Sequence, residues 1–146
     1  MSKQVIIERA DGPVAFELRP DDFTIDPSHI DLELCNLGRT MLEYGELETE
    51  LRLEFERKDA ALEKLEADID MLLRAHFSNT GVKVTEKKLE CEIARNVTRL
   101  AAVESKAVSN RHWNMMRWAM KALEAKKDCL VALAYRERQL MKADEF

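Results

Sequence analysis

The longest regular pattern along the chain is a heptad of apolar positions between Ile30 and His76. Alternate steps of four and three residues visit fourteen positions, of which eleven are apolar, namely Ile30, Leu34, Leu37, Met41, Tyr44, Glu48, Leu51, Phe55, Lys58, Leu62, Leu65, Ile69, Leu72 and His76. Such a stripe on an otherwise Glu- and Lys-rich segment is typical of a coiled-coil-like helix that buries the stripe against other helices. The helix-start signal Asp26-Pro27-Ser28 precedes it, so we predict a helix over about 28–77.

Turn residues and weak helix formers mark the expected interruptions of the helices. Gly38 and Gly45 each cost about 1 kcal/mol against alanine inside a helix, so they indicate a kink or a break near Tyr44. A polar turn over 78–84 ends the first helix, and helices follow over about 85–143. Within these, Asn96-Val97-Thr98 weakens helix propensity and indicates a bend or an interruption.

Apolar residues spread around the second helical segment between Trp113 and Tyr135. A helix that is apolar on so much of its circumference packs on more than one side, either inside a bundle or in an interface between subunits. A long, thin helical hairpin cannot bury both stripes alone. We therefore expect a homo-oligomer.

Residues 1–27 differ from the rest of the chain because they contain two short segments rich in residues that favour β-strands. Val5-Ile6-Ile7 and Val14–Leu18 flank a turn sequence that contains Asp11-Gly12-Pro13. An isolated hairpin is marginal in water, so this arm needs a surface, either its own helices or a neighbouring subunit. The predicted fold is mainly α: a long helical hairpin or coiled-coil-like bundle over 28–146 with a short β-textured arm, in an oligomer.

Composition supports a helical protein without a membrane segment or a catalytic motif. The 146 residues are 46% hydrophobic and 35% charged, with only four glycines and three prolines. We find no membrane-length apolar stretch or signal peptide, and we expect a cytoplasmic protein, in the host cytoplasm if it belongs to a phage. Cys35, Cys91 and Cys129 are far apart and fit reduced, buried thiols. No phosphate loop, metal motif or nucleophile motif occurs, so we expect neither an enzyme nor a cofactor.

Charge is divided unequally between the two halves of the chain. Residues 1–76 hold 19 acidic and 9 basic side chains, whereas residues 77–146 hold 9 acidic and 14 basic ones. Such asymmetry is typical of a polyanion-binding surface on the basic half. Pairing between acidic and basic helices explains it equally well.

Cations and indoles alternate in the basic half, and this is the pattern that single-stranded nucleic acid prefers. Cations follow the phosphates while aromatic rings stack on bases, at about 1–3 kcal/mol per stacked base. The candidate residues are Lys83, Lys87, Lys88, Arg95, Arg99, Arg117, Trp118 and Lys121. Trp113 shares an apolar stripe with Met116 and is assigned to the core, whereas Trp118 fits either a stacking platform or the core. The lysines and arginines also fit an ordinary solvated face.

Two stretches resemble a known family. The stretch Trp113–Arg138, with Ala122–Asp128 and Tyr135-Arg136-Glu137-Arg138, resembles the end of the phage recombination mediators of the UvsY type. Val84–Glu90 is similar to a helix start in their relatives. The resemblance covers about residues 82–140. It implies a ring-like homo-oligomer that binds single-stranded DNA and helps a strand-exchange recombinase displace single-strand-binding protein.

The chain departs from this family before the central turn. The family places its DNA-contacting cations there, but residues 46–73 are net acidic in this chain. The resemblance therefore adds only Arg57 and Lys58 to the candidate site. Lys58 is included because it interrupts the apolar heptad, where an unneeded charge is costly.

Together these features predict a non-enzymatic accessory protein of phage-type recombination that binds single-stranded DNA and assists loading of a strand-exchange recombinase. The alternative is a helical protein–protein interaction module, such as a phage assembly scaffold, a chaperone or an inhibitor of a host protein. That module engages a basic partner through the acidic first helix and does not bind DNA.

Overall fold

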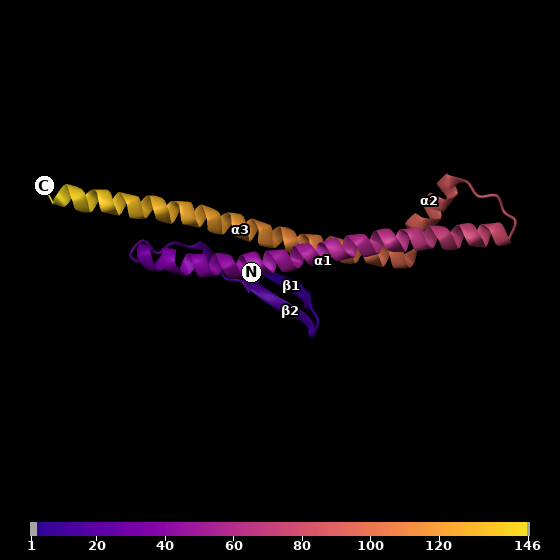
Figure 1. Ribbon diagram of the computed structural model, residues 1–146, viewed down its shortest axis with the longest axis horizontal. Coiled ribbons are helices and arrows are strands. Elements are labelled where there is room, and N and C mark those ends of the chain that lie inside the picture. The colour runs from indigo at the N-terminus through magenta and orange to yellow at the C-terminus, as the bar shows by residue number, and fades with distance from the viewer. Residues whose placement is uncertain (1–2, 146) are drawn as a thin grey trace. The chain divides into compact units, whose positions relative to one another are not determined.

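A computed structural model describes residues 3–145 of the chain. They form β1 (Lys3–Arg9), β2 (Gly12–Leu18), the 3₁₀ helix η1 (Pro20–Phe23), α1 (Ile30–Asn79), α2 (Glu86–Arg95) and α3 (Val97–Asp144) (Figure 1). The prediction of a mainly helical chain with a short β-textured arm is confirmed. No helix among the described residues is long and apolar enough to cross a membrane. The described residues of 1–51 and 112–146 form one compact unit, and residues 52–111 form a second.

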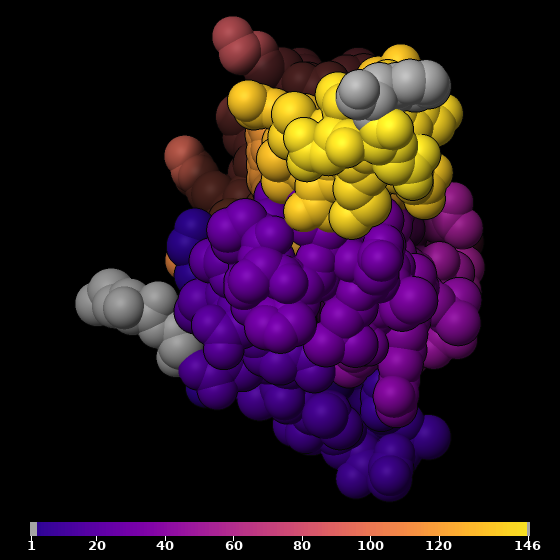
Figure 2. All heavy atoms as spheres, turned by 90° about the vertical axis from the view of Figure 1, so that its left-hand side faces the viewer, coloured from indigo at the N-terminus to yellow at the C-terminus, as the bar shows by residue number. Residues whose placement is uncertain are grey.

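β1 and β2 form an antiparallel hairpin whose inner face packs in the first unit. The register pairs Val5 with Phe16 and Ile7 with Val14. Val5 and Ile7 are buried in one cluster with side chains of α1 and α3, while the residue between them points outward. Gly12 ends the turn with φ +119°, which glycine adopts without strain. The arm therefore lies on helices of its own chain, and Figure 2 shows its indigo side chains against the purple first half of α1.

In the first unit, α1 packs against α3 through the apolar stripes that the sequence predicts. The buried side chains are Ile30, Leu37, Tyr44, Leu47 and Leu51 of α1 with Met116, Ala119, Leu123, Leu130 and Ala134 of α3. Trp113 Nε1 donates to the carboxylate of Glu48 at 2.6 Å, and Lys126 Nζ lies 2.7 Å from the carboxylate of Glu33. Because residues later in α3 contact residues earlier in α1, the two segments are antiparallel.

The second unit repeats this antiparallel arrangement. Lys106 of α3 pairs with Asp59 of α1, and Arg99 Nε lies 2.7 Å from the carboxylate of Glu66. Leu62 and Ile69 are the buried heptad residues of this part of α1. The same heptad therefore faces inward in both units.

Asn96 interrupts the helices where the sequence indicates a bend or an interruption. Its backbone is extended, with ψ at 123°, and it separates α2 from α3. Its side-chain Oδ1 accepts a hydrogen bond from the backbone N–H of Arg99 at 3.1 Å, as an N-cap residue does. The interruption is thus a capped helix start.

Two expectations about α1 and the cysteines were wrong. α1 continues through Gly38 and Gly45 without the expected break near Tyr44. Tyr44 is fully buried, and Met120 packs over Gly45, where an added Cβ would lie 3.9 Å from Met120 Cε. Tertiary packing therefore outweighs the low helix propensity of glycine. The three cysteines, expected to be buried, are exposed, because each lies on a helix face away from the core.

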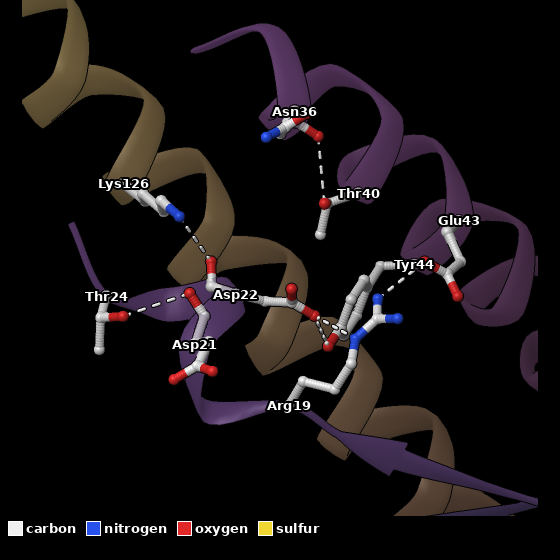
Figure 3. A network of polar contacts seen from close by, with 9 residues as sticks. All are labelled: Arg19, Asp21, Asp22, Thr24, Asn36, Thr40, Glu43, Tyr44 and Lys126. Atoms are coloured by element: carbon white, nitrogen blue, oxygen red, sulfur yellow. Dashed lines mark hydrogen bonds and ion pairs between the residues drawn. The ribbon is translucent and has the colours of Figure 1, made fainter. Parts of the chain in front are cut away.

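A polar network joins the arm to both helices of the first unit (Figure 3). The carboxylate of Asp22 accepts hydrogen bonds from Tyr44 Oη at 2.8 Å and Arg19 Nε at 2.7 Å. Arg19 Nη2 also donates to the carboxylate of Glu43 at 2.8 Å, and Lys126 Nζ donates to the backbone carbonyl of Asp22 at 3.1 Å. Phe16 and Phe23 of the arm meet the Tyr44 ring edge to face. These contacts therefore fix η1 against both α1 and α3.

We predict that Tyr44 titrates only at high pH. Burial raises the pKa of Tyr44 to about 12, and the hydrogen bond to Asp22 adds to the rise. Because the pKa is raised on folding from the ordinary value of 10.0, the stability that Tyr44 contributes is present below about pH 10 and is lost as the pH rises towards 12. The chain has two tyrosines, so Tyr135→Phe leaves Tyr44 as the only phenol that ultraviolet absorbance can report.

In that variant we expect a single phenolate step near pH 12. Adding Asp22→Asn removes the charged acceptor and moves the step to lower pH. A step near pH 10 while circular dichroism still shows a folded protein would contradict the buried network.

Candidate nucleic-acid interface

The cations predicted in the basic half begin at a well-defined turn between α1 and α2. Gly81 has φ +69°, and the N–H of Val82 donates to the carbonyl of Phe77 at 3.2 Å, which is the pattern of a glycine C-cap. Thr85 then caps α2, because its Oγ1 accepts a hydrogen bond from the backbone N–H of Lys88 at 3.3 Å. These two caps fix where the lysines that follow Val82 lie on the second unit.

One face of α2 is basic. Lys87 and Arg95 are eight residues apart and Lys88 is seven residues before Arg95, so the three side chains lie on the same side of the helix. Leu89, on the other side, is buried, which turns the cations outward. Among the described residues, no ion pair holds Lys87, Arg95 or the exposed Lys83 before the helix. Glu90 and Glu92 flank the basic face.

An aromatic side chain that the sequence analysis did not select lies beside these cations. Lys88 Nζ is 5.1 Å from the centre of the Phe77 ring, and the ring of His76 meets Phe77 edge to face at 5.6 Å. Glu86, the acidic residue nearest this group in sequence, is held by Arg74 at 3.0 and 2.8 Å. The hydrogen bonds from Arg74 lower the pKa of Glu86. The structure thus joins Phe77 and Lys88 in one cation–aromatic group, with Lys87 next to Lys88 on α2.

Other candidate cations are already occupied by carboxylates. Arg99 is paired with Glu66, and Lys58 Nζ lies 3.0 Å from the carboxylate of Glu54. The charge of Lys58 in the heptad is thereby matched within α1 itself. Arg57, the other residue that the family resemblance adds, is exposed.

Arg117, Trp118 and Lys121 form a separate group on α3 in the first unit. The Trp118 side chain is 68% exposed, and Lys121 Nζ lies 4.8 Å from the centre of its ring. The Arg117 guanidinium lies 5.2 Å from the ring of Trp113, which packs on the core and is hydrogen bonded to Glu48. The assignment of Trp113 to the core is confirmed, and Trp118 lies outside it.

Trp118 also lines an apolar pocket of about 410 Å³ between the arm and α3. Leu18, Pro20 and Phe23 form the arm side of this pocket. On α3 it is lined by Met115, Trp118, Ala119 and Ala122. The sequence could not reveal the pocket, because its walls come from segments almost a hundred residues apart. A cluster of residues able to hold a metal ion is absent from residues 3–145.

Comparison of the chain with protein-family models, curated proteins and solved structures found no match. Among the described residues, the candidate cations take part in two separate cation–aromatic groups, one around α2 in the second unit and one on α3 in the first unit.

We predict that the α2 face depends on the Thr85 cap. The Lys88 N–H donates both to Thr85 Oγ1 at 3.3 Å and to the Thr85 carbonyl at 3.0 Å. Thr85→Ala removes the first of these acceptors and costs about 1 kcal/mol, roughly a fivefold loss of protection against hydrogen exchange. Exchange of the Lys88 and Leu89 amides measures this loss. Thr85→Ser keeps the hydroxyl and serves as the control. Equal protection in the alanine variant and the unmodified protein would show that the cap does not hold α2.

Proposed function

We propose that this protein is a non-enzymatic, self-associating accessory factor that binds single-stranded DNA through the outer face of α2. The observation that carries the proposal is the outward face of α2, with Lys87, Lys88 and Arg95 opposite the buried Leu89. Lys88 lies over the Phe77 ring, and the exposed Lys83 precedes the helix. A single strand needs cations along its phosphates and a ring for its bases. The α2 face supplies the cations, and Phe77 near the end of α1 supplies the ring.

We place the DNA contact on α2 and not at Trp118. Both rings have a lysine over them, but the Trp118 indole also borders an apolar pocket, whereas Phe77 lies beside the cations of α2 that form no ion pair with another described residue. The cations of α2 lie on the basic half of the chain, as the charge asymmetry favours.

The recombination role rests on the resemblance of residues 82–140 to the phage mediators, which is the segment that contains α2. The activity that this resemblance implies is to help a strand-exchange recombinase displace single-strand-binding protein from single-stranded DNA. Self-association is supported by large apolar side chains on the surface, among them Met71, Leu72 and Tyr135. Exposed apolar surface of this kind is typical of protein contacts.

We predict that replacing Lys83, Lys87 and Lys88 together with alanine weakens binding of a fluorescent oligonucleotide. Each phosphate contact contributes about 0.7 to the slope of log affinity against log salt, so three lost contacts lower it by about 2. Anisotropy across a salt series measures both quantities. The loss should be equal for different sequences, because phosphates carry no sequence information.

A charge-matched control is Lys64, Lys127 and Lys142 replaced together with alanine, since these exposed lysines lie elsewhere. It should leave the slope almost unchanged. Arg57→Ala with Lys58→Ala tests the family-derived site in the same assay. If the unmodified protein does not bind at low salt, the DNA proposal is wrong, and the protein-only interaction module replaces it.

A further inference from the structure

The outer face of α3 carries a second heptad of exposed residues, of which only the first two border the arm, across the apolar pocket. Steps of four and three residues visit Trp118, Ala122, Ala125, Cys129 and Ala132, which we call the outer stripe. All five are exposed, and they lie apart from the buried residues by which α3 meets α1. A repeat of 3.5 residues keeps such a stripe facing a partner helix, and alanines let two backbones approach closely.

Two opposite charges border the outer stripe on the same side. Lys121 and Asp128 each directly precede a stripe residue and are seven residues apart. Neither forms an ion pair with another described residue. In an antiparallel pair of identical helices, this flanking position faces itself across the contact, so Lys121 of each helix meets Asp128 of the other.

A parallel pair does not have this complementarity. The flanking residue would then face the position five residues further along the partner helix, which places Lys121 against a second lysine, Lys126. Lys126 is moreover buried and held by Glu33 in its own chain. The charges therefore favour the antiparallel orientation.

We propose that two copies of this chain pair through the outer stripes of α3, antiparallel and related by a two-fold axis. The register that joins Lys121 to Asp128 of the partner subunit also sets Ala122 opposite Ala125 of the partner subunit, and Trp118 opposite Cys129 of the partner subunit. The contact covers the exposed Trp118. It also covers the open side of the apolar pocket, because Trp118 and Ala122 belong to both surfaces. The interface specifies the self-association of the proposed function, but it does not need DNA.

Mixed disulfides test the register. In a background of Cys35→Ser, Cys91→Ser and Cys129→Ala, one chain carries Ala122→Cys and another carries Ala125→Cys. Mild oxidation of the mixture should give mainly the cross-link between the two different chains. Arg138→Cys, off the stripe and exposed, is the control that should remain uncross-linked. If each variant instead cross-links mainly to a second copy of the same variant, the antiparallel register is wrong.

Charge reversal tests the pairing in the full-length protein. Lys121→Glu and Asp128→Lys each place like charges together twice per dimer, so each should raise the dissociation constant of the dimer by about tenfold or more in sedimentation. The double variant should restore it. Both positions are exposed, and circular dichroism verifies that the variants fold. A protein that stays monomeric, or associates equally well in all variants, overturns this interface. Oligonucleotide binding is measured separately, so a monomer that binds DNA leaves the proposed function standing.

Discussion

The buried ammonium of Lys126 is the group on which the first unit depends. Its side chain is only 7% exposed, and an unpaired charge at such a position costs several kcal/mol. Two groups satisfy it, the carboxylate of Glu33 on α1 and the backbone carbonyl of Asp22 in η1. Because Lys126 and these two groups lie on three separate elements, their contacts set the register of α3 against α1 and also the position of the arm.

Much of this fold could be predicted from spacing, but the position of Lys126 could not. The heptad of α1, the turn before α2 and the two strand segments follow from local patterns that need no partner. Lys126 lies in a Lys126-Lys127-Asp128 run that is typical of a solvated face. Its burial depends on Glu33, 93 positions earlier, and no local pattern reports such a partner. For the same reason, the sequence could not show which surface the arm lies on.

The candidate site shows the same division between local and distant information. Spacing alone places Lys87, Lys88 and Arg95 on one face of a helix, and the structure has them so. It could not show that Arg99 is neutralised by Glu66, or that Phe77 lies under Lys88, because both contacts join different helices. Composition predicts which cations exist, whereas tertiary structure decides which are open to a ligand.

The charge asymmetry of the chain therefore has two physical origins. Part of the positive charge of the basic half is neutralised inside the units. There Arg99, Lys106 and Lys126 pair with carboxylates of α1. This is the pairing of acidic and basic helices that the sequence left as an alternative. The cations of α2 do not take part in such pairing, because one buried residue, Leu89, anchors this short helix and leaves them on the far side. α2 has three basic and three acidic residues, but Lys87, Lys88 and Arg95 share one face, and none of them forms an ion pair with another described residue. A polyanion is therefore best sought on this face.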